Sequence, residues 1–391
     1  MIKFISNALV LIIVFQTFND NLFVEYLGPN SLKISITIFA LFYFKYFFSF
    51  KSFTPINRKI LLLCVIMTLC SAINYNQLSF PLESFTTPFI ILVYFCIFSQ
   101  YKDIKWLIFC IFFSLVFSSI YCLIREDLIG EWTFRKTGGT GDPNEFSVGV
   151  LFGLGLMCGL YLKYKKYLLV VLLLSLLFLS TLIAAGSKSA FFTLMILILI
   201  LIFYIVKKAS FFKKFKLLFS ISLVFSIISY TFYYLNVEVF SLFLQRFESS
   251  RTADLRYDNW SRGFNLFKDN WLFGLGTNNY SSIMQNTYTG TDEGADAAHN
   301  MYLQVLYELG ILGFFPFIFI VKDLLNNIFF NNRNYIILLI CTSFLIMGFT
   351  LSLSYEKYVW LIIALSFNNH FINFFLQKSF KYENNTIYSK P

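Results

Sequence analysis

Charged residues are scarce in this chain: Asp, Glu, Lys and Arg make up only 13% of its 391 residues, about half the share typical of soluble domains. So few charges cannot cover a water-facing surface when 58% of the residues are hydrophobic. The composition therefore excludes a cytoplasmic enzyme, a secreted disulfide-linked domain and a disordered protein. It predicts an all-α integral membrane protein whose apolar side chains face lipid or other helices.

Paired cysteines are also lacking. The chain has seven cysteines, an odd number; they lie in or beside apolar segments and none forms a Cys-x-x-Cys pair. Disulfide frameworks and metal sites need clustered ligands, so we interpret these cysteines as small packing residues. They are Cys64, Cys70, Cys96, Cys110, Cys122, Cys158 and Cys341.

Apolar segments about 20 residues long predict transmembrane helices, and we count about 12 of them. The clearest are residues 4–18, 34–50, 106–124, 146–162, 168–185, 190–206, 217–235, 301–321, 335–353 and 358–376. Segments 60–73 and 85–98 are shorter and interrupted by polar residues or proline. If both cross the membrane or neither does, the later helices keep the same predicted orientation. This divides the chain into helices 1–9 (residues 1–235), a long loop (236–299), helices 10–12 (300–377) and a tail (378–391).

The net charge of +10 reflects membrane topology. If both termini are cytoplasmic, the predicted inner loops carry 20 Lys and Arg but only 3 Asp and Glu, whereas the rest of the chain carries 11 and 18. Short cytoplasmic loops of membrane proteins are enriched in Lys and Arg. The basic excess therefore argues for a lipid bilayer as the partner and against nucleic acid.

The long loop, predicted on the outer face, is polar but carries Trp260, Phe264, Phe267 and Trp271 at helical spacing. This pattern predicts short amphipathic helices that lie on the membrane or cap a cavity. Loops of this length in a compact fold are usually functional.

The strongest candidate site lies where this loop meets the next helix. His299 is followed by Asn300, Gln304 and Glu308, which make one polar stripe on a helix that descends into the bilayer. An acid at that depth normally faces the protein interior or a wet cavity, and a histidine can accept a proton from an attacking hydroxyl. The alternative is structural: His299 and Asn300 cap the helix, and Glu308 pairs across the bundle.

Basic residues recur through the long loop and suggest an anion site, because the arginine fork matches phosphate oxygens. The alternative is ordinary ion pairing with the interleaved acids Glu248, Asp254, Asp258 and Asp269. The basic residues are Arg246, Arg251, Arg256, Arg262 and Lys268.

Three other positions on the predicted outer side carry charge. Lys188 lies in a tight turn between two helices, where it must face water, an acid or a phosphate. Asp142 and Glu145 open a helix, and capping is the simpler explanation of that pattern. Glu356 precedes the last helix and either orients an imidazole or is a solvated turn acid.

Four segments now combine into a pattern that resembles the O-antigen polymerase and ligase family. They are Arg-Tyr-Asp-Asn-Trp at 256–260, Asp-Asn-Trp-Leu-Phe-Gly-Leu-Gly-Thr-Asn-Asn-Tyr at 269–280, His-Asn-Met-Tyr-Leu-Gln at 299–304 and Glu-Leu-Gly-Ile-Leu-Gly at 308–313. Asp-Pro-Asn-Glu at 142–145 and Gly-Ser-Lys-Ser at 186–189 match weaker upstream patterns of that family. The resemblance covers about residues 130–320.

The resemblance implies a helical membrane glycosyltransferase that uses sugars carried on undecaprenyl diphosphate and needs neither a nucleotide sugar nor a metal. By position, His299 would be the catalytic proton acceptor and Arg256 a diphosphate ligand. Lys188 stands where ligases usually have Arg, and Glu356 is the candidate for a second catalytic acid. We expect Arg251, Arg262 and Asn300 to line the same substrate site.

Two activities fit the resemblance, both in the bacterial inner membrane. A polymerase joins one lipid-linked repeat to another, sometimes with a chain-length regulator, and a ligase passes the glycan to lipid A-core. The Asp-Pro-Asn-Glu element and Lys188 favour the polymerase. A transporter of an anionic solute is a third possibility, which the absence of paired halves disfavours.

Overall fold

The computed structural model describes residues 2–28, 31–43, 54–79, 81–124, 137–140, 142–164, 168–208, 251–288, 297–331 and 335–376. These residues form helices joined by short turns, and no strand occurs among them. The all-helical class is therefore as predicted. The predicted span 217–235 and the tail 378–391 lie outside the described residues.

The first half of the chain contributes α1 (Ile2–Phe18), α2 (Asp20–Leu27), α3 (Ser31–Phe42), α5 (Pro55–Ile73), the 3-10 turn η2 (Tyr75–Gln77), α6 (Pro81–Phe98), α7 (Ile104–Ile124), α8 (Pro143–Tyr164), α9 (Leu168–Ala185) and α10 (Lys188–Lys208). After the gap follow α13 (Arg251–Asp269), α14 (Tyr280–Thr287), α15 (Met301–Asn326), the π-helical turn η3 (Asn327–Asn331), α16 (Tyr335–Met347), α17 (Lys357–Ser366) and α18 (Asn369–Leu376).

Six of these helices are long and apolar enough to cross a membrane: α5, α6, α7, α8, α9 and the stretch Met301–Phe329. Two bent pairs, α1 with α2 and α17 with α18, raise the number to eight if each pair is one span. The described residues thus account for six to eight of the roughly twelve spans that the sequence predicts, and α10 and α16 contain shorter apolar helices.

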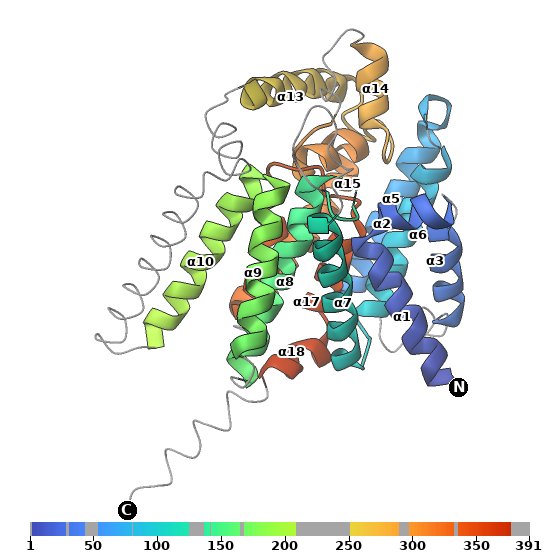
Figure 1. The fold of residues 1–391 in the computed structure, drawn as a ribbon. Coiled ribbons are helices and arrows are strands. Elements are labelled where there is room, and N and C mark those ends of the chain that lie inside the picture. The colour runs from blue at the N-terminus through green and yellow to red at the C-terminus, as the bar shows by residue number, and fades with distance from the viewer. Residues whose placement is uncertain are drawn as a thin grey trace, which may run out of the picture.

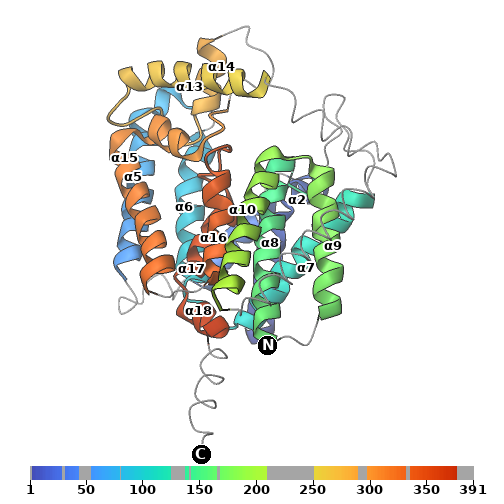
Figure 2. The same cartoon turned by 90° about the vertical axis from the view of Figure 1, so that its left-hand side faces the viewer.

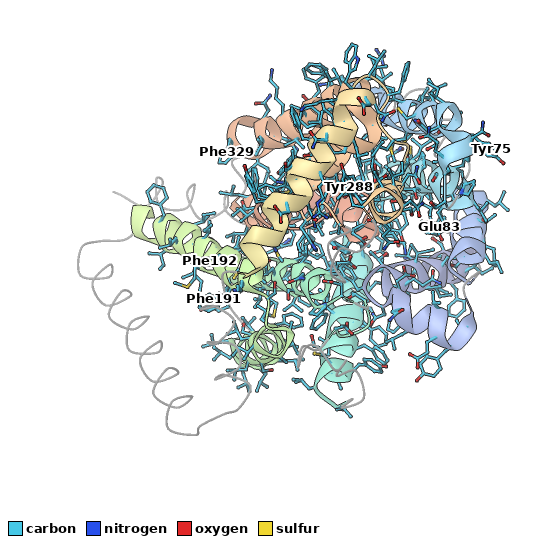
Figure 3. The ribbon with its side chains drawn as sticks, turned by 90° about the horizontal axis from the view of Figure 1, so that it is seen from above. Tyr75, Glu83, Phe191, Phe192, Tyr288 and Phe329 are labelled. Atoms are coloured by element: carbon cyan, nitrogen blue, oxygen red, sulfur yellow. The ribbon has the colours of Figure 1, made fainter. Side chains whose placement is uncertain are left out.

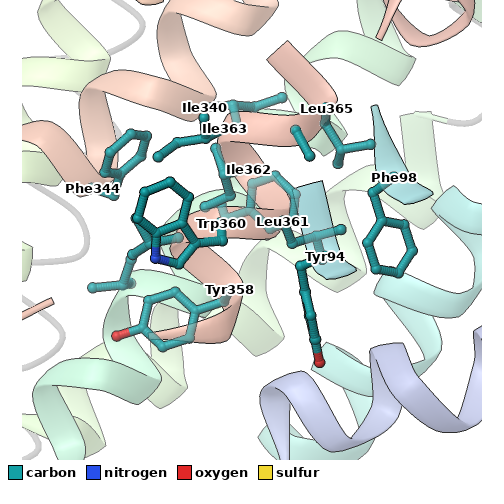
Figure 4. Packing of buried hydrophobic residues seen from close by; sticks show 14 of the residues in the cluster. Tyr94, Phe98, Ile340, Phe344, Tyr358, Trp360, Leu361, Ile362, Ile363 and Leu365 are labelled. Atoms are coloured by element: carbon teal, nitrogen blue, oxygen red, sulfur yellow. The ribbon is translucent and has the colours of Figure 1, made fainter. Parts of the chain in front are cut away.

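Helix α17 lies at the centre of the bundle and packs against α1, α6, α16 and α18. Every residue from Tyr358 to Leu365 is at most 2% exposed, and Figure 4 shows their side chains packed against neighbouring helices. The Trp360 indole donates a hydrogen bond to the backbone carbonyl of Ser354, 2.9 Å away. Because aromatic and branched side chains surround it on all sides, α17 is a core helix without a lipid-facing stripe.

Helices α13 and α14 lie across one end of the bundle, which we call the capped end (Figures 1 and 2). Both come from the predicted long outer loop, and both pack against α15. At the opposite end, the Lys59 ammonium at the start of α5 lies 2.6 Å from the Asp323 carboxylate near the end of α15. The predicted outer loop and these predicted inner residues therefore lie at opposite ends of the bundle.

Candidate functional site

Helix α15 begins with a complete side-chain cap. The Asn300 side-chain oxygen accepts hydrogen bonds from the backbone amides of Tyr302 and Leu303, at 3.0 and 3.1 Å. The Met301 amide donates to the backbone carbonyl of Gly348, 2.7 Å away. The start of α15 is therefore fixed to the turn that follows α16, and Asn300 has the capping role that the sequence offered as the structural alternative.

His299, immediately before this cap, is half-buried and has a φ of +45°. This left-handed conformation is unfavourable for a residue with a Cβ atom, so the surrounding contacts must impose it. They come from α13: the Trp260 indole donates to the Ala298 carbonyl at 2.7 Å, and the Asn259 amide donates to the Ala297 carbonyl at 3.3 Å. The histidine is thus held from both sides, by α13 before it and by the α15 cap after it.

Two stacked tyrosines hold α13 in place. The Tyr280 hydroxyl donates to the Asn259 carbonyl at 2.9 Å, and the Tyr307 hydroxyl donates to the Trp260 carbonyl at 3.1 Å. Their rings stack with centroids 5.4 Å apart. Gly263 lies against this pair, since a Cβ atom there would be 2.6 Å from the Tyr307 ring. The glycine therefore allows the close approach of α13 to the tyrosines.

Glu308 fastens the turn that precedes Tyr280. Its carboxylate is 1% exposed and accepts hydrogen bonds from the backbone amides of Asn278 and Tyr280, at 2.9 and 3.1 Å. Asn278 adopts a φ of +56° at this turn. Burial and the nearby Glu308 carboxylate raise the pKa of Tyr355, so its hydroxyl is neutral. Glu308, the last residue of the predicted polar stripe, thus points into the protein. It holds the turn before Tyr280, and Tyr280 in turn bonds to α13.

Helix α15 is broken at Gly310, where φ is +63° and ψ is −167°. An unbroken helix would bond the amides of Ile311 and Leu312 to the carbonyls of Tyr307 and Glu308. Here those amides donate to the carbonyls of residues 271 and 272, and the two carbonyls accept from the amides of residues 275 and 276. The segment 271–276 therefore enters the gap in the helix, and four bonds between segments replace two bonds within the helix.

Of the four arginines predicted to bind an anion, Arg246 lies outside the described residues, and the other three do not share one face of α13. Successive residues turn by about 100° on a helix, so Arg251 and Arg262 lie about 20° apart, and Arg256 lies more than 100° away from both. Arg262 contacts the Tyr288 ring at 5.3 Å, on the α14 side (Figure 3). Arg256 is half-buried and one turn before Trp260; burial lowers its pKa. Of the three, Arg256 lies on the face that holds the residues before His299.

Lys188 is half-buried and begins α10 after a turn in which Gly186 has a φ of +57°. The main neighbours of α10 are α8 and α16. Figures 1 and 3 place the first turns of α13 above the start of α10. Lys188 and Arg256 thus come from two elements that lie one above the other at the capped end.

The loop that precedes Glu356 contacts the first turns of α15, and its Ser354 hydroxyl donates to the Gln304 side-chain oxygen at 2.6 Å. Residues 348 and 349 of this loop accept hydrogen bonds from Met301 and Asn300, whereas Glu356 interacts with Asp142 and Asp20 at the starts of α8 and α2. Asp142 caps α8, with its side-chain oxygen 2.6 Å from the amide of Asn144. The sequence predicted this cap but not the assembly of the acids, which are far apart in the chain.

Burial raises the pKa of Glu356 to about 7; Asp20 and Asp142 also raise it, and Lys357 opposes them. The folded protein then keeps a proton that the unfolded chain loses near pH 4.5, so stability falls as the pH rises from about 4.5 to about 7. We expect Glu356→Gln, which imitates the protonated acid, to flatten this fall by up to about 3 kcal/mol. Melting curves of both proteins between pH 4.5 and pH 8 measure the effect, and parallel curves would contradict it.

The fold and site define a multi-pass helical membrane protein with a helical cap over one end, in which a strained histidine is held between the cap and a broken helix. Residues 173–318, which include α13, α14 and the start of α15, match the family model described as O-antigen ligase. Residues 173–318, which are 146 of the 391 residues, are therefore similar to the O-antigen polymerase and ligase family. No curated protein matches the chain significantly.

Proposed function

We propose that the protein is a membrane glycosyltransferase that polymerises a surface polysaccharide from repeats carried on undecaprenyl diphosphate. The observation that carries this proposal is the fixed, strained position of His299 beside α13, within the region that matches the family. Strained backbone conformations concentrate at functional sites because the surrounding structure must maintain them. The predicted topology puts this site on the periplasmic side of the bacterial inner membrane.

The proposed step is a direct displacement. The acceptor hydroxyl oxygen forms a bond to the anomeric carbon of the donor while its proton passes to the imidazole of His299. The bond between that carbon and the phosphate oxygen breaks, and its electron pair leaves with undecaprenyl diphosphate. Arg256 and Lys188 supply fixed positive charge to the leaving diphosphate, which lowers the barrier for its departure. The imidazolium then returns its proton to water.

The test uses a strain that lacks the gene, complemented with wild type, His299→Ala or His370→Ala. His370 is the other histidine of the chain, is exposed on α18 and serves as the matched control. We expect wild type and His370→Ala to restore the full ladder of polymer lengths, and His299→Ala to insert into the membrane but restore no polymer. A normal ladder from His299→Ala would contradict the proposal.

The second candidate is transfer of the finished glycan to lipid A-core, favoured by the ligase description of the matching family model. The same knockout separates the two activities. Loss of a polymerase leaves lipopolysaccharide with a single repeat, whereas loss of a ligase leaves a bare core while lipid-linked polymer accumulates. The proposed roles of His299, Arg256 and Lys188 are the same for a polymerase and a ligase, because both reactions need a base and a diphosphate site.

A further inference from the structure

Four carboxylates gather at the capped end where three helices begin. Asp20 opens α2, Asp142 and Glu145 open α8, and Glu356 immediately precedes α17. We call these four residues the acidic group; each is half-buried. The carboxylate of Glu145 interacts electrostatically with those of Glu356, Asp142 and Asp20 and with the Lys357 ammonium. Helix starts favour negative charge, which helps four acids to coexist here.

Two of these four acids have no hydrogen-bond or ion-pair partner among the described residues. Asp142 caps α8, and one oxygen of Asp20 pairs with Lys357. The carboxylates of Glu145 and Glu356, by contrast, make no hydrogen bond or ion pair with the described residues, and Glu356 does not cap α17. Beside them lies the Tyr358 hydroxyl, which interacts with Glu145, Glu356 and Asp142. Tyr358 is 2% exposed, and its hydroxyl has no hydrogen-bond partner in the described part of the chain.

Carboxylate oxygens next to a phenol without a partner among the described residues suit a ligand that both donates and accepts hydrogen bonds. Buried polar groups without partners are rare because each costs about 1–3 kcal/mol. The described acids are not arranged to hold a metal ion. A diphosphate is also unsuitable, because Lys357 offsets only one of four potential negative charges. Neutral or amino sugars fit, since their hydroxyl and amino groups donate to carboxylates and a ring or hydroxyl oxygen accepts from Tyr358.

We propose that Glu145, Glu356 and Tyr358 form a subsite for the saccharide of the acceptor, separate from the diphosphate site at Arg256 and Lys188. This inference rests on the proposed function. The loop 348–356 connects the two places: its first residues hold the cap beside His299, and its last residue belongs to the acidic group. Eight peptide units reach at most about 28 Å, so an oligosaccharide bound at the acidic group can extend toward the histidine.

The experiment measures binding of a phosphate-free oligosaccharide to the full-length protein in lipid nanodiscs. The probe is the repeat released from its lipid carrier by mild acid hydrolysis, and saturation-transfer NMR gives its dissociation constant. We expect the double variant Glu145→Gln with Glu356→Gln to bind at least tenfold more weakly than wild type, and Tyr358→Phe several-fold more weakly. Glu83→Gln is the matched control, because Glu83 is an exposed acid at the start of α6 at the same end (Figure 3).

Tyr358→Phe keeps the ring in its packed position and removes only the hydroxyl, so it tests the subsite even if the double variant does not fold. In transfer assays that use the phosphate-free repeat as the acceptor, the KM for this acceptor should rise while the KM for the lipid-linked donor stays the same. The proposal is overturned if wild type shows no saturable binding, if the variants bind like wild type, or if binding requires a divalent cation. Loss of transfer in His299→Ala would still support the proposed function in each of these cases.

Discussion

Replacing Glu308 by alanine is expected to lower the rate of glycan transfer at least about a hundredfold, although Glu308 contacts neither proposed substrate. The carboxylate accepts hydrogen bonds from the backbone amides of Asn278 and Tyr280. Each hydrogen bond to a charged group contributes about 1.5–3 kcal/mol to stability. Without it the two buried amides lose their partner, Tyr280 loses its place, and α13 no longer fixes the residues before His299. Misplacement of a catalytic group by about 1 Å costs on the order of a hundredfold.

Transfer assays on equal amounts of inserted protein, together with hydrogen exchange over residues 277–299, measure this effect. Asp323→Asn is the matched control, because Asp323 lies in the same helix but pairs with Lys59 at the opposite end. Glu308→Gln should retain part of the activity, since its amide oxygen can still accept one of the two bonds. Wild-type transfer with unchanged exchange in Glu308→Ala would show that the tyrosines and α13 hold His299 without this carboxylate.

A methyl group at Gly310 or Gly274 is expected to prevent correct folding of the site. A Cβ atom on Gly310 would lie 2.3 Å from the Leu272 carbonyl oxygen, and one on Gly274 would lie 2.4 Å from the backbone of Glu308. Both glycines have positive φ angles, and neither obstacle is a side chain that can rotate away. We therefore expect Gly310→Ala and Gly274→Ala each to cost several kcal/mol, among the largest effects of single substitutions.

Gly28→Ala separates the steric cost from the conformational cost. Gly28 has a φ of +85° and a ψ of 163° but no atom within 4 Å of its ideal Cβ position, so its substitution should cost about 1–3 kcal/mol from backbone conformation alone. Thermal unfolding in detergent, followed by size-exclusion profiles, compares the three variants. Gly310→Ala as stable as Gly28→Ala would mean that segment 271–276 can leave the helix without loss of the fold.

The sequence predicted the helical membrane class and several helix bounds closely, because the bilayer forces long apolar segments into helices. The segment predicted at 168–185 is α9 itself, and the one at 106–124 differs from α7 only in its first residues. The sequence predicts one transmembrane helix over residues 301–321. The break at Gly310 was missed because its cause lies in segment 271–276, a partner that helical periodicity does not reveal.

The candidate site was predictable in its residues but not in its geometry. The sequence predicts one polar stripe of Asn300, Gln304 and Glu308 after His299. In the structure Asn300 caps the helix, Glu308 attaches the loop, and His299 has the strained backbone. The sequence predicts one anion site from the basic residues of the long loop, whereas α13 places Arg256 on a different face from Arg251 and Arg262. The acidic group could not be foreseen, since Asp20, Asp142 and Glu356 meet only after α2, α8 and α17 have packed.

The interleaving of segment 271–276 with α15 constrains the order of assembly. Because this segment precedes α15 in the chain, it emerges from the ribosome first and has no partner for its amides at 275 and 276 until the helix arrives. In the broken form of the helix, the amides of residues 311 and 312 in turn have their partners in segment 271–276. We therefore expect the cap and the broken helix to mature together, and the proposed site not to form on a truncated chain that stops before α15.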